Sequence, residues 1–547
     1  MTIAQLQQGD AMGIEWRTSR VAWLMILVAS LGSALGCFRG GGGGAGETGS
    51  TLIYGRGGDA NGLDPIHTDI GESVKVIVNL FDTLVAYDDD TLDLVPSLAE
   101  AWKTSADGKL WTFQLRPGVK FHDGNPLTAE AVVFTFERIL DSDHPHVYSN
   151  VIPYYSNFAV IERVEAVDDL TVAFHLKEPQ AMFLAHMAMF PAAIVSPEAV
   201  KASGSGFTRN PVGTGPFRFV RWKTDQEIVL DRFDEHWRGP AGVERLIFLP
   251  INESSIRVQQ LQRGEIHFAD NLPPSEVNQL VGQPGIEVQD TPGVNVAFLT
   301  MQNEKPPLDS KELRQAIWHA IDREHLVEIA YSGQAKVTDT MVPPTIWGHH
   351  DGLPKRDFDP ERARELVEQV AQKRDLKLPI KLELFVMDQP RPYMQQPRQT
   401  AIYLKDALEK VGFEIEIVTN DIRQHFFRMT RGEHQLGLAG WTADVIDPDN
   451  FLYTLLDQDN INDDGGNNHS RYRNQEVHDL LIAAQTELDQ DRRIELYREA
   501  QEKIFEDAPV VPLVNTNVRM ALRQELKGYR LHPSALMRLR QAHFGKE

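Results

Sequence analysis

The 547-residue chain is acidic, with a net charge of −23, and 42% of its residues are hydrophobic. This composition excludes a disordered chain, and the acidity argues against nucleic acid as a partner, because phosphate binding relies on clustered lysine and arginine. The length predicts two or three domains with separate cores, and a single cysteine excludes an internal disulfide.

The N-terminal segment has the pattern of an export signal. Arg17 and Arg20 precede an apolar run at residues 21–34, which is shorter than the roughly 20 residues that a membrane-spanning helix needs. Asp10 and Glu15 are unusual in the first part of such a signal, and Met12 is therefore an alternative start. No later segment is long and apolar enough to span a membrane.

The only cysteine, Cys37, stands where this signal ends. With the Ala-Leu-Gly that precedes it, Cys37 resembles the box of bacterial lipoproteins, in which the cysteine becomes the lipidated N-terminus. The alternative is an incidental cysteine in a cleaved peptide. We predict that residues 1–36 are a lipoprotein signal peptide and that the glycine-rich residues 37–50 are a flexible tether. The protein is then exported and anchored by lipid, in the periplasm or on the outer face of the cell membrane.

Strand and helix patterns are mixed after residue 51. Apolar residues alternate with polar ones at residues 111–115 and 170–176, which predicts half-buried strands. Thr128 is placed to cap a helix with an apolar face, and residues 313–321 carry an apolar stripe at helical spacing. Asp359, followed by a proline, predicts the start of another helix. The mixture indicates an α/β protein of several layers.

Two extended apolar runs, at residues 293–301 and 509–518, have the character of crossings between lobes. If both connect the same two lobes, the second lobe is an insertion into the first. We therefore predict one lobe from residues 51–296 and 515–547 and a second from residues 297–514, with a cleft that closes about two hinges.

Motifs of catalysis are missing from the sequence. It contains no GxxxxGK[ST] phosphate loop, no HExxH zinc helix and no GxSxG nucleophile elbow. His349 and His350 suggest a metal site only weakly, since adjacent histidines rarely converge on one ion, and the same holds for His144 and His146. We predict no enzyme activity, no cofactor and no metal, and a secreted peptidase is a minor alternative.

Residues 98–140, which include the sequence LRPGVKFHDGNPLTAE, resemble the signature region of the family-5 solute-binding proteins of ABC importers. Residues 211–217 (PVGTGPF), 313–322 and 470–481 extend the resemblance. It implies an α/β fold of the periplasmic-binding-protein-like type II class, with two lobes around a ligand cleft, two hinge crossings and an extra subdomain on the first lobe.

Two further segments resemble the dipeptide-binding branch of that family: residues 389–393 (QPRPY), with one extra proline, and residues 440–451 (GWTADVIDPDNF). In that branch the aspartate of the WTxD segment binds the peptide's ammonium group, and the arginine before Pro-Tyr binds its carboxylate. The resemblance gives these roles to Asp444 and Arg391.

Three further residues are candidates for the wall of the cleft. Trp441 and Tyr393 flank the predicted anchors and belong either to the wall or to the core. Gly71 lies in an early loop that lines the cleft in the family but departs here from the dipeptide branch.

Opposed charges suit a zwitterionic ligand, because a dipeptide has its ends about 5–7 Å apart and an arginine fork matches a carboxylate. The sequence thus predicts a monomeric receptor that captures a short peptide, with a dipeptide favoured, and passes it to the membrane subunits of an ABC importer. Longer oligopeptides, haem, nickel complexes and oligosaccharides are alternatives within the class. The charged atoms of the two anchors are expected roughly 8–12 Å apart.

Overall fold

A computed structural model describes residues 50–89, 91–149, 151–463 and 465–545. Backbone contacts divide the chain into Met1–Thr48 and Gly49–Glu547, and all described residues belong to the second unit. The predicted signal peptide (residues 1–36), Cys37 and all but the last residue of the predicted tether lie outside the described residues. In the described part, no helix is both long and apolar enough to cross a membrane.

The largest element of the described chain is a twelve-stranded sheet. Its strands are β1 (Thr51–Arg56), β8 (Phe217–Lys223), β9 (Glu227–Arg232), β10 (Arg245–Pro250), β11 (Phe268–Ala269), β12 (Ile286–Pro292), β13 (Asn295–Met301), β14 (Ala335–Val337), β15 (Ile380–Met387), β16 (Phe413–Asn420), β17 (Leu436–Thr442) and β18 (Val510–Arg523). The order is β16-β15-β17-β13-β18-β11-β1-β10-β9-β8, and β12 and β14 also pair with β18.

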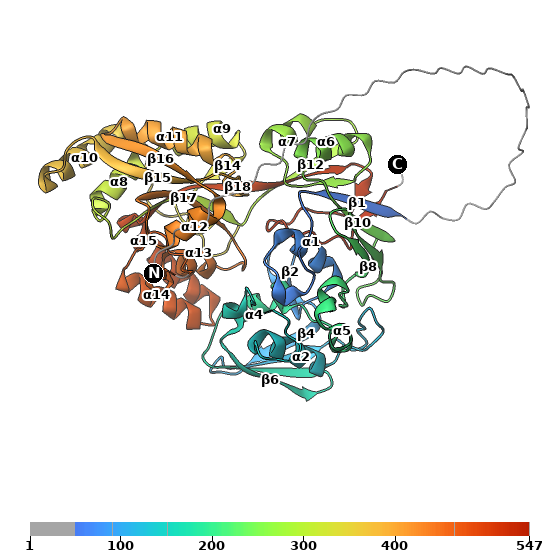
Figure 1. The fold of residues 1–547 in the computed structure, drawn as a ribbon. Coiled ribbons are helices and arrows are strands. Elements are labelled where there is room, and N and C mark those ends of the chain that lie inside the picture. The colour runs from blue at the N-terminus through green and yellow to red at the C-terminus, as the bar shows by residue number, and fades with distance from the viewer. Residues whose placement is uncertain (1–49, 90, 150, 464, 546–547) are drawn as a thin grey trace, which may run out of the picture. The chain divides into compact units, whose positions relative to one another are not determined.

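The long strand β18 belongs to both halves of this sheet (Figure 1). Near its start Val510 pairs with Thr300 of β13, and near its end Arg523 pairs with Ile286 of β12. The two extended apolar runs predicted from the sequence are thus strands, and they lie side by side in antiparallel register. One strand therefore carries backbone hydrogen bonds from one half of the sheet to the other.

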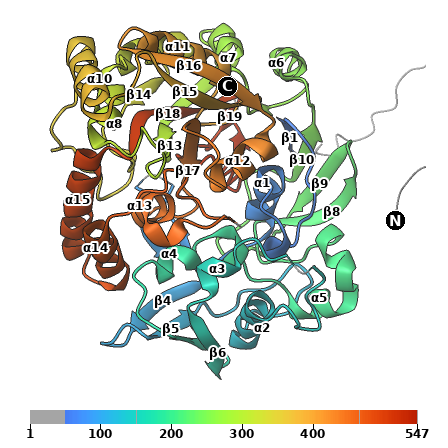
Figure 2. The same ribbon diagram turned by 60° about the vertical axis from the view of Figure 1, so that its left-hand side comes forward.

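A separate sheet has the order β4-β5-β7-β6 and lies beside helix α2 (Ala129–Leu140), as Figure 2 shows. Its strands are β4 (Ala99–Thr104), β5 (Leu110–Leu115), β6 (Ile161–Asp168) and β7 (Thr171–Leu176). The two alternating patterns predicted as strands are β5 and β7, which is confirmed. Phe113 and Phe174 are fully buried between them and α2, with ring centres 5.5 Å apart.

The prediction for Thr128 is partly wrong. Thr128 is the residue before α2, as expected, but its side chain makes no capping hydrogen bond. A capping side chain would accept a hydrogen bond from the backbone amide of Ala131. This amide instead donates to the carbonyl oxygen of Thr128 at 3.1 Å. The first turn is therefore closed by the backbone.

The other predicted helix signals are confirmed in α8 (Lys311–His319) and α10 (Pro360–Arg374). Asp359 caps α10 by accepting a hydrogen bond from the backbone amide of Arg362 at 2.9 Å. The apolar stripe runs past the end of α8, because Ile321 is buried although the helix ends before it.

The remaining helices cover the sheets and their connections. They are α1 (Gly71–Leu80), α3 (Tyr155–Phe158), α4 (Phe183–Met187), α5 (Pro197–Ser203), α6 (Ser254–Arg263), α7 (Pro274–Leu280), α9 (Arg323–Tyr331), α11 (Pro397–Glu409), α12 (Ile422–Thr430), α13 (Asp449–Leu456), α14 (Gln475–Thr486) and α15 (Gln490–Asp507). Short 3₁₀ turns are η1 (Pro65–His67), η2 (Phe190–Ala192), η3 (Gly204–Arg209) and η4 (Gln458–Asn460). Two small ribbons pair β2 (Val85–Tyr87) with β3 (Leu94–Pro96) and β19 (Leu526–Lys527) with β20 (His543–Phe544).

Candidate ligand-binding cavity

A cavity of about 1900 Å³ lies among α1, β13, β17 and β18. All five residues predicted to bind ligand line it, and they come from three distant parts of the sequence: Gly71, Arg391, Tyr393, Trp441 and Asp444. The structure therefore brings the predicted residues together at one cavity, and their roles toward a ligand stay predictions.

Trp441 lies near the end of strand β17 and Asp444 lies just after it, and both line the cavity. Trp441 pairs with Val296 of β13 near the end of the strand, and Asp444 follows in the turn that leads to α13. Asn450, at the start of α13, fixes both residues: its Oδ1 accepts hydrogen bonds from the indole Nε1 of Trp441 and from the backbone amide of Asp444, each at 3.0 Å. The side-chain amide thus positions the end of the strand.

The carboxylate of Asp444 is exposed to the cavity. The surrounding protein removes much of its water, and this burial raises the pKa of Asp444 to about 6. The Tyr154 hydroxyl lies 3.5 Å from its Oδ1, which is a long hydrogen bond. Among the described residues no lysine, arginine or histidine forms an ion pair with Asp444. A carboxylate in this position is suited to a cation supplied from outside the chain.

Arg391 lies in a tight loop after β15. Its backbone amide and carbonyl exchange hydrogen bonds with those of Met394, at 3.0 and 2.9 Å. The side chain is exposed, and within the described chain no carboxylate pairs with its guanidinium group. A positive charge without a carboxylate partner therefore faces the same cavity as Asp444.

Three contacts hold this loop in place. The ring of Tyr393 packs on the backbone of β17, where an added Cβ at Gly440 would lie 2.1 Å from Tyr393 Cδ2. The Tyr331 hydroxyl donates to the carbonyl oxygen of Tyr393 at 3.3 Å. The Thr516 hydroxyl, on β18, lies 3.1 Å from the carbonyl oxygen of Pro392. The loop is thereby attached both to β17 and to β18.

Buried amide side chains fix β13 against β18 beside the cavity. Asn295 Nδ2 donates to the carbonyl oxygen of Thr516 at 3.0 Å, and its Oδ1 accepts from the Thr516 amide at 3.0 Å. Asn515 Nδ2 donates to the carbonyl oxygens of Gly293 and Asn295 at 2.8 and 2.7 Å. These bonds lie beyond the last regular pair of the two strands, Ala297 with Val514, and continue the attachment of β13 to β18 toward Gly293.

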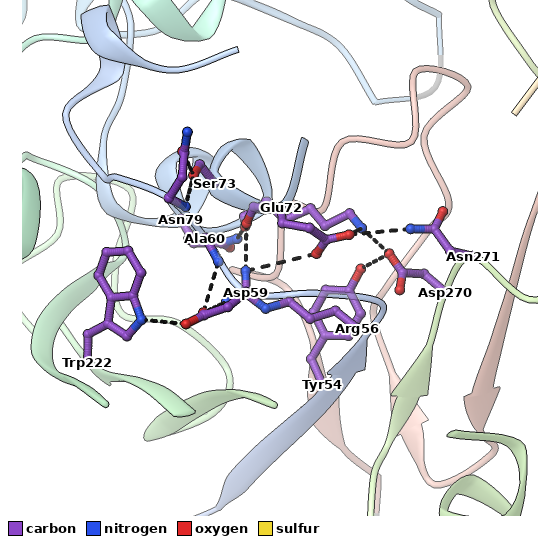
Figure 3. A network of polar contacts seen from close by, with 12 residues as sticks. Tyr54, Arg56, Asp59, Ala60, Glu72, Ser73, Asn79, Trp222, Asp270 and Asn271 are labelled. Atoms are coloured by element: carbon purple, nitrogen blue, oxygen red, sulfur yellow. Dashed lines mark hydrogen bonds and ion pairs between the residues drawn. The ribbon is translucent and has the colours of Figure 1, made fainter. Parts of the chain in front are cut away.

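Gly71 is the first residue of α1, and an added Cβ there would meet no atom within 4 Å. The helix is fixed by a network of charged groups, shown in Figure 3. Lys75 forms ion pairs with Glu72, at 2.7 Å, and with Asp270. The Tyr54 hydroxyl on β1 donates to the same Asp270 carboxylate at 2.6 Å. The network therefore ties the cavity-facing end of α1 to β1 and β11.

One histidine that the sequence did not single out, His469, lines the cavity, and burial lowers its pKa to about 4. The adjacent histidines that suggested a metal site are held by other contacts. His349 Nδ1 lies 2.7 Å from the carbonyl oxygen of Val342, and His350 pairs with Glu502. In the part of the chain that is described, one group of side chains has the spacing of metal ligands, and it lies outside the lining of the cavity: Asp457, Asp459 and His478.

Sequence reasoning missed several residues that shape the cavity. Gly440 and Asn450 lie inside the segment that resembles the dipeptide branch, and their positions within that segment were a usable signal. Tyr154, Thr516 and Asn295 are distant in sequence from both anchors and carry no local pattern that marks them.

The chain is similar to known solute-binding proteins. The family model for bacterial extracellular solute-binding proteins, family 5 Middle, matches residues 93–463. The dipeptide-binding protein of Escherichia coli (strain K12) is 32% identical over 500 residues, which are 88% of this chain and 92% of that protein.

Solved structures are similar as well. A structure of DppA from Helicobacter pylori in complex with the peptide STSA has a TM-score of 0.77 at 32% identity and covers 91% of this chain and 98% of that one. A structure of HbpA2 from Haemophilus parasuis has a TM-score of 0.84 at 29% identity, over 91% and 100% of the two chains.

Proposed function

The chain belongs to the bacterial extracellular solute-binding proteins of family 5, and from this premise we propose that it captures a short peptide, with a dipeptide favoured. Asp444 binds the ammonium group of the peptide and Arg391 binds its carboxylate. The mixed α/β structure has the type II periplasmic-binding-protein fold predicted from the sequence. As a member of this family the protein is an exported receptor that serves an ABC importer. We propose further that it does not alter its ligand.

One observation carries the proposal: Asp444 and Arg391 line one cavity, and neither has an oppositely charged partner among the described residues. Both side chains are exposed to the cavity, so two opposite charges without partners on one cavity favour a ligand that carries both charges. A free dipeptide is such a zwitterion. Each charged hydrogen bond contributes roughly 1.5–3 kcal/mol, and the two anchors would supply much of the roughly 8 kcal/mol of micromolar binding.

The other three predicted residues suit the body of a peptide. Trp441 and Tyr393 provide aromatic walls, and the open space at Gly71 leaves room for the ligand. None of these residues adds a charge, so they favour contact with the peptide backbone and with apolar side chains.

We propose that residues 51–296 and 515–547 form one lobe and residues 297–514 the other. The double pairing of β18 supports this division, because β18 joins β13 at one end and β12 at the other. Closure about this strand pair would bury the peptide, and the closed form would dock on the membrane subunits.

The N-terminal segment belongs to the proposal as well. Residues 1–36 act as a lipoprotein signal peptide, Cys37 carries the lipid, and residues 37–50 form a tether that lets a monomeric receptor reach its importer.

Longer peptides are the second candidate ligand. The cavity of about 1900 Å³ is larger than the roughly 300–1,000 Å³ of ordinary ligand sites, and the similar H. pylori structure holds the peptide STSA. His469 at the cavity wall keeps a nickel or haem ligand as an alternative to test, whereas opposed charged anchors offer little to an oligosaccharide.

Titration calorimetry with end-blocked peptides tests the proposal. Ala-Ala should bind, and both N-acetylation and C-amidation should weaken it by roughly ten- to a hundredfold, which is the loss of one charged hydrogen bond. Asp444→Asn should lose affinity for free Ala-Ala yet discriminate little against the acetylated form, and Arg391→Gln should behave likewise toward the amidated form. Equal affinity of free and blocked peptides for the unaltered protein would refute the proposal. Mass spectrometry of the recovered peptides should find them uncut.

A further inference from the structure

The wall of the cavity carries a second group of arginines, apart from the predicted carboxylate anchor. Arg238, Arg538 and Arg540 line the cavity, and Arg116 lies beside them with its guanidinium carbon 4.6 Å from the centre of the Trp237 ring. The chain as a whole has a net charge of −23. Asp82, Asp88 and Asp89 line the same cavity and offset part of the positive charge of these arginines, and an anion would neutralise more of it.

Trp237 contacts two of these arginines, Arg116 and Arg238. The guanidinium carbon of Arg238 lies 4.4 Å from the centre of the same ring that Arg116 contacts. The indole is fixed because its Nε1 donates to Asp82 Oδ2 at 3.1 Å, and the Thr214 hydroxyl donates to the same oxygen at 2.9 Å. A guanidinium that stacks on a ring uses its face, so its N–H edge stays available for an acceptor.

The arginines have few acceptors within the chain. In the described residues no carboxylate lies within ion-pairing distance of Arg238 or Arg540. Arg238 Nη2 donates to the carbonyl oxygen of Pro96 at 3.0 Å, and Arg540 Nη1 donates to the carbonyl oxygen of Arg238 at 3.4 Å. Arg538 is paired with Asp89 at 2.9 Å. Most of the donors of Arg238 and Arg540 are therefore free to bind another group.

The electrostatics agree with this geometry. Burial lowers the pKa of Arg238 most, Asp82 raises it, and the nearby guanidinium groups of Arg540, Arg538 and Arg116 lower it by smaller amounts. The carboxylate of Asp82 accepts hydrogen bonds from Thr214 and the indole and keeps its charge, so it offsets part of the repulsion among the arginines. A bound anion would relieve the remaining repulsion.

We propose that Arg238, Arg538 and Arg540 form a second subsite of the cavity, which binds a carboxylate or phosphate group. The volume of about 1900 Å³ leaves room for such a group beyond a dipeptide held at Asp444. The anion is either an additional carboxylate of the bound peptide or a free phosphate. The first source rests on the proposed peptide-binding function, and the second does not.

Calorimetry on the whole protein with two kinds of probe distinguishes these sources. One probe is inorganic phosphate. The other is the pair Ala-Ala-Glu and Ala-Ala-Gln, which differ in one negative charge. The test variant is R238Q/R540Q. The matched control is R218Q/R398Q, which removes two exposed arginines outside the lining of the cavity.

The unaltered protein should either bind phosphate saturably or prefer Ala-Ala-Glu over Ala-Ala-Gln at least tenfold. R238Q/R540Q should abolish that result and R218Q/R398Q should preserve it. The subsite is refuted if the unaltered protein shows neither effect, or if R238Q/R540Q matches it. Should the double variant fail to fold, R540Q alone should weaken the effect at least threefold, and an unchanged R540Q would equally refute the subsite.

Neutral Ala-Ala serves as the reference ligand in every variant. Unchanged Ala-Ala binding by R238Q/R540Q shows that the fold and the peptide anchors are intact. Failure of the unaltered protein to bind Ala-Ala would instead refute the proposed function, and the phosphate titration would still decide the subsite.

Discussion

Dipeptide affinity should fall as the pH is lowered, because Asp444 must be ionised to bind an ammonium group. Burial raises the pKa of this carboxyl group to about 6 in the ligand-free protein, so the neutral form predominates below that pH. The ligand itself changes little between about pH 5 and pH 7, since its amino group has a pKa near 7.7–8.0 and its carboxyl group near 3.3–3.7. The guanidinium group of Arg391 stays charged throughout.

The expected size of the effect follows from the ionised fraction. With a pKa of about 6, roughly nine-tenths of Asp444 is ionised at about pH 7 and roughly one-tenth at about pH 5. The dissociation constant of Ala-Ala should therefore rise about tenfold over this range. At about pH 6 binding should release about half a proton, because the ammonium group selects the ionised carboxylate.

Calorimetry at several pH values, each in two buffers of different ionisation enthalpy, measures both quantities. D444N is the control and should bind weakly with no pH dependence over the same range. A flat profile in the unaltered protein, or an equal slope in D444N, would show that Asp444 does not bind the amine.

Three substitutions test the support of the anchors. G440A places a methyl group into the ring of Tyr393. It should lower the free energy of unfolding by about 1–3 kcal/mol in urea and weaken peptide binding in calorimetry. The control G206A, at an open position, should change neither quantity. N450A removes the acceptor shared by the Trp441 indole and the Asp444 amide and should weaken Ala-Ala binding at least threefold while stability changes by about 1 kcal/mol. T516V should cost about 1 kcal/mol in urea unfolding, since it removes the hydroxyl that donates its one proton either to Asn295 Oδ1 or to the carbonyl oxygen of Pro392; an unchanged midpoint would mean that this hydroxyl does not stabilise the loop.

Local patterns in the sequence were sufficient for much of the fold. The alternation around Phe113 and Phe174 predicted β5 and β7 because side-chain period is a property of the strand itself. Asp359 predicted the start of α10 because a capping side chain acts within the first turn of its own helix. Thr128 shows what local patterns do not predict. Its backbone carbonyl closes the first turn of α2, and the sequence does not indicate whether the carbonyl or the hydroxyl of this residue accepts the hydrogen bond.

The cavity was predictable only through the resemblance to the family. Asp444 and Arg391 were named from short matching segments, and spacing alone would not have paired them. The arginine group was not predicted because its members lie far apart in the sequence, from Arg116 to Arg540, and are brought together by the tertiary fold, through Trp237 for Arg116 and Arg238 and through the Arg238 carbonyl for Arg540. Side-chain groups of this kind depend on tertiary contacts, which local periodicity in the sequence does not predict.

The two anchors are attached to the same pair of strands, which has a consequence for ligand length. Asp444 follows β17, which pairs with β13 along its length, and the loop of Arg391 contacts β18 through Thr516. Asn295 and the backbone of Thr516 join β13 to β18 through two hydrogen bonds. Because the backbone of each anchor is fixed to this joined pair, the protein limits the distance that their charged groups can span. A peptide of the wrong length would lose one charged contact, so the receptor should discriminate by backbone length more strongly than by side chain.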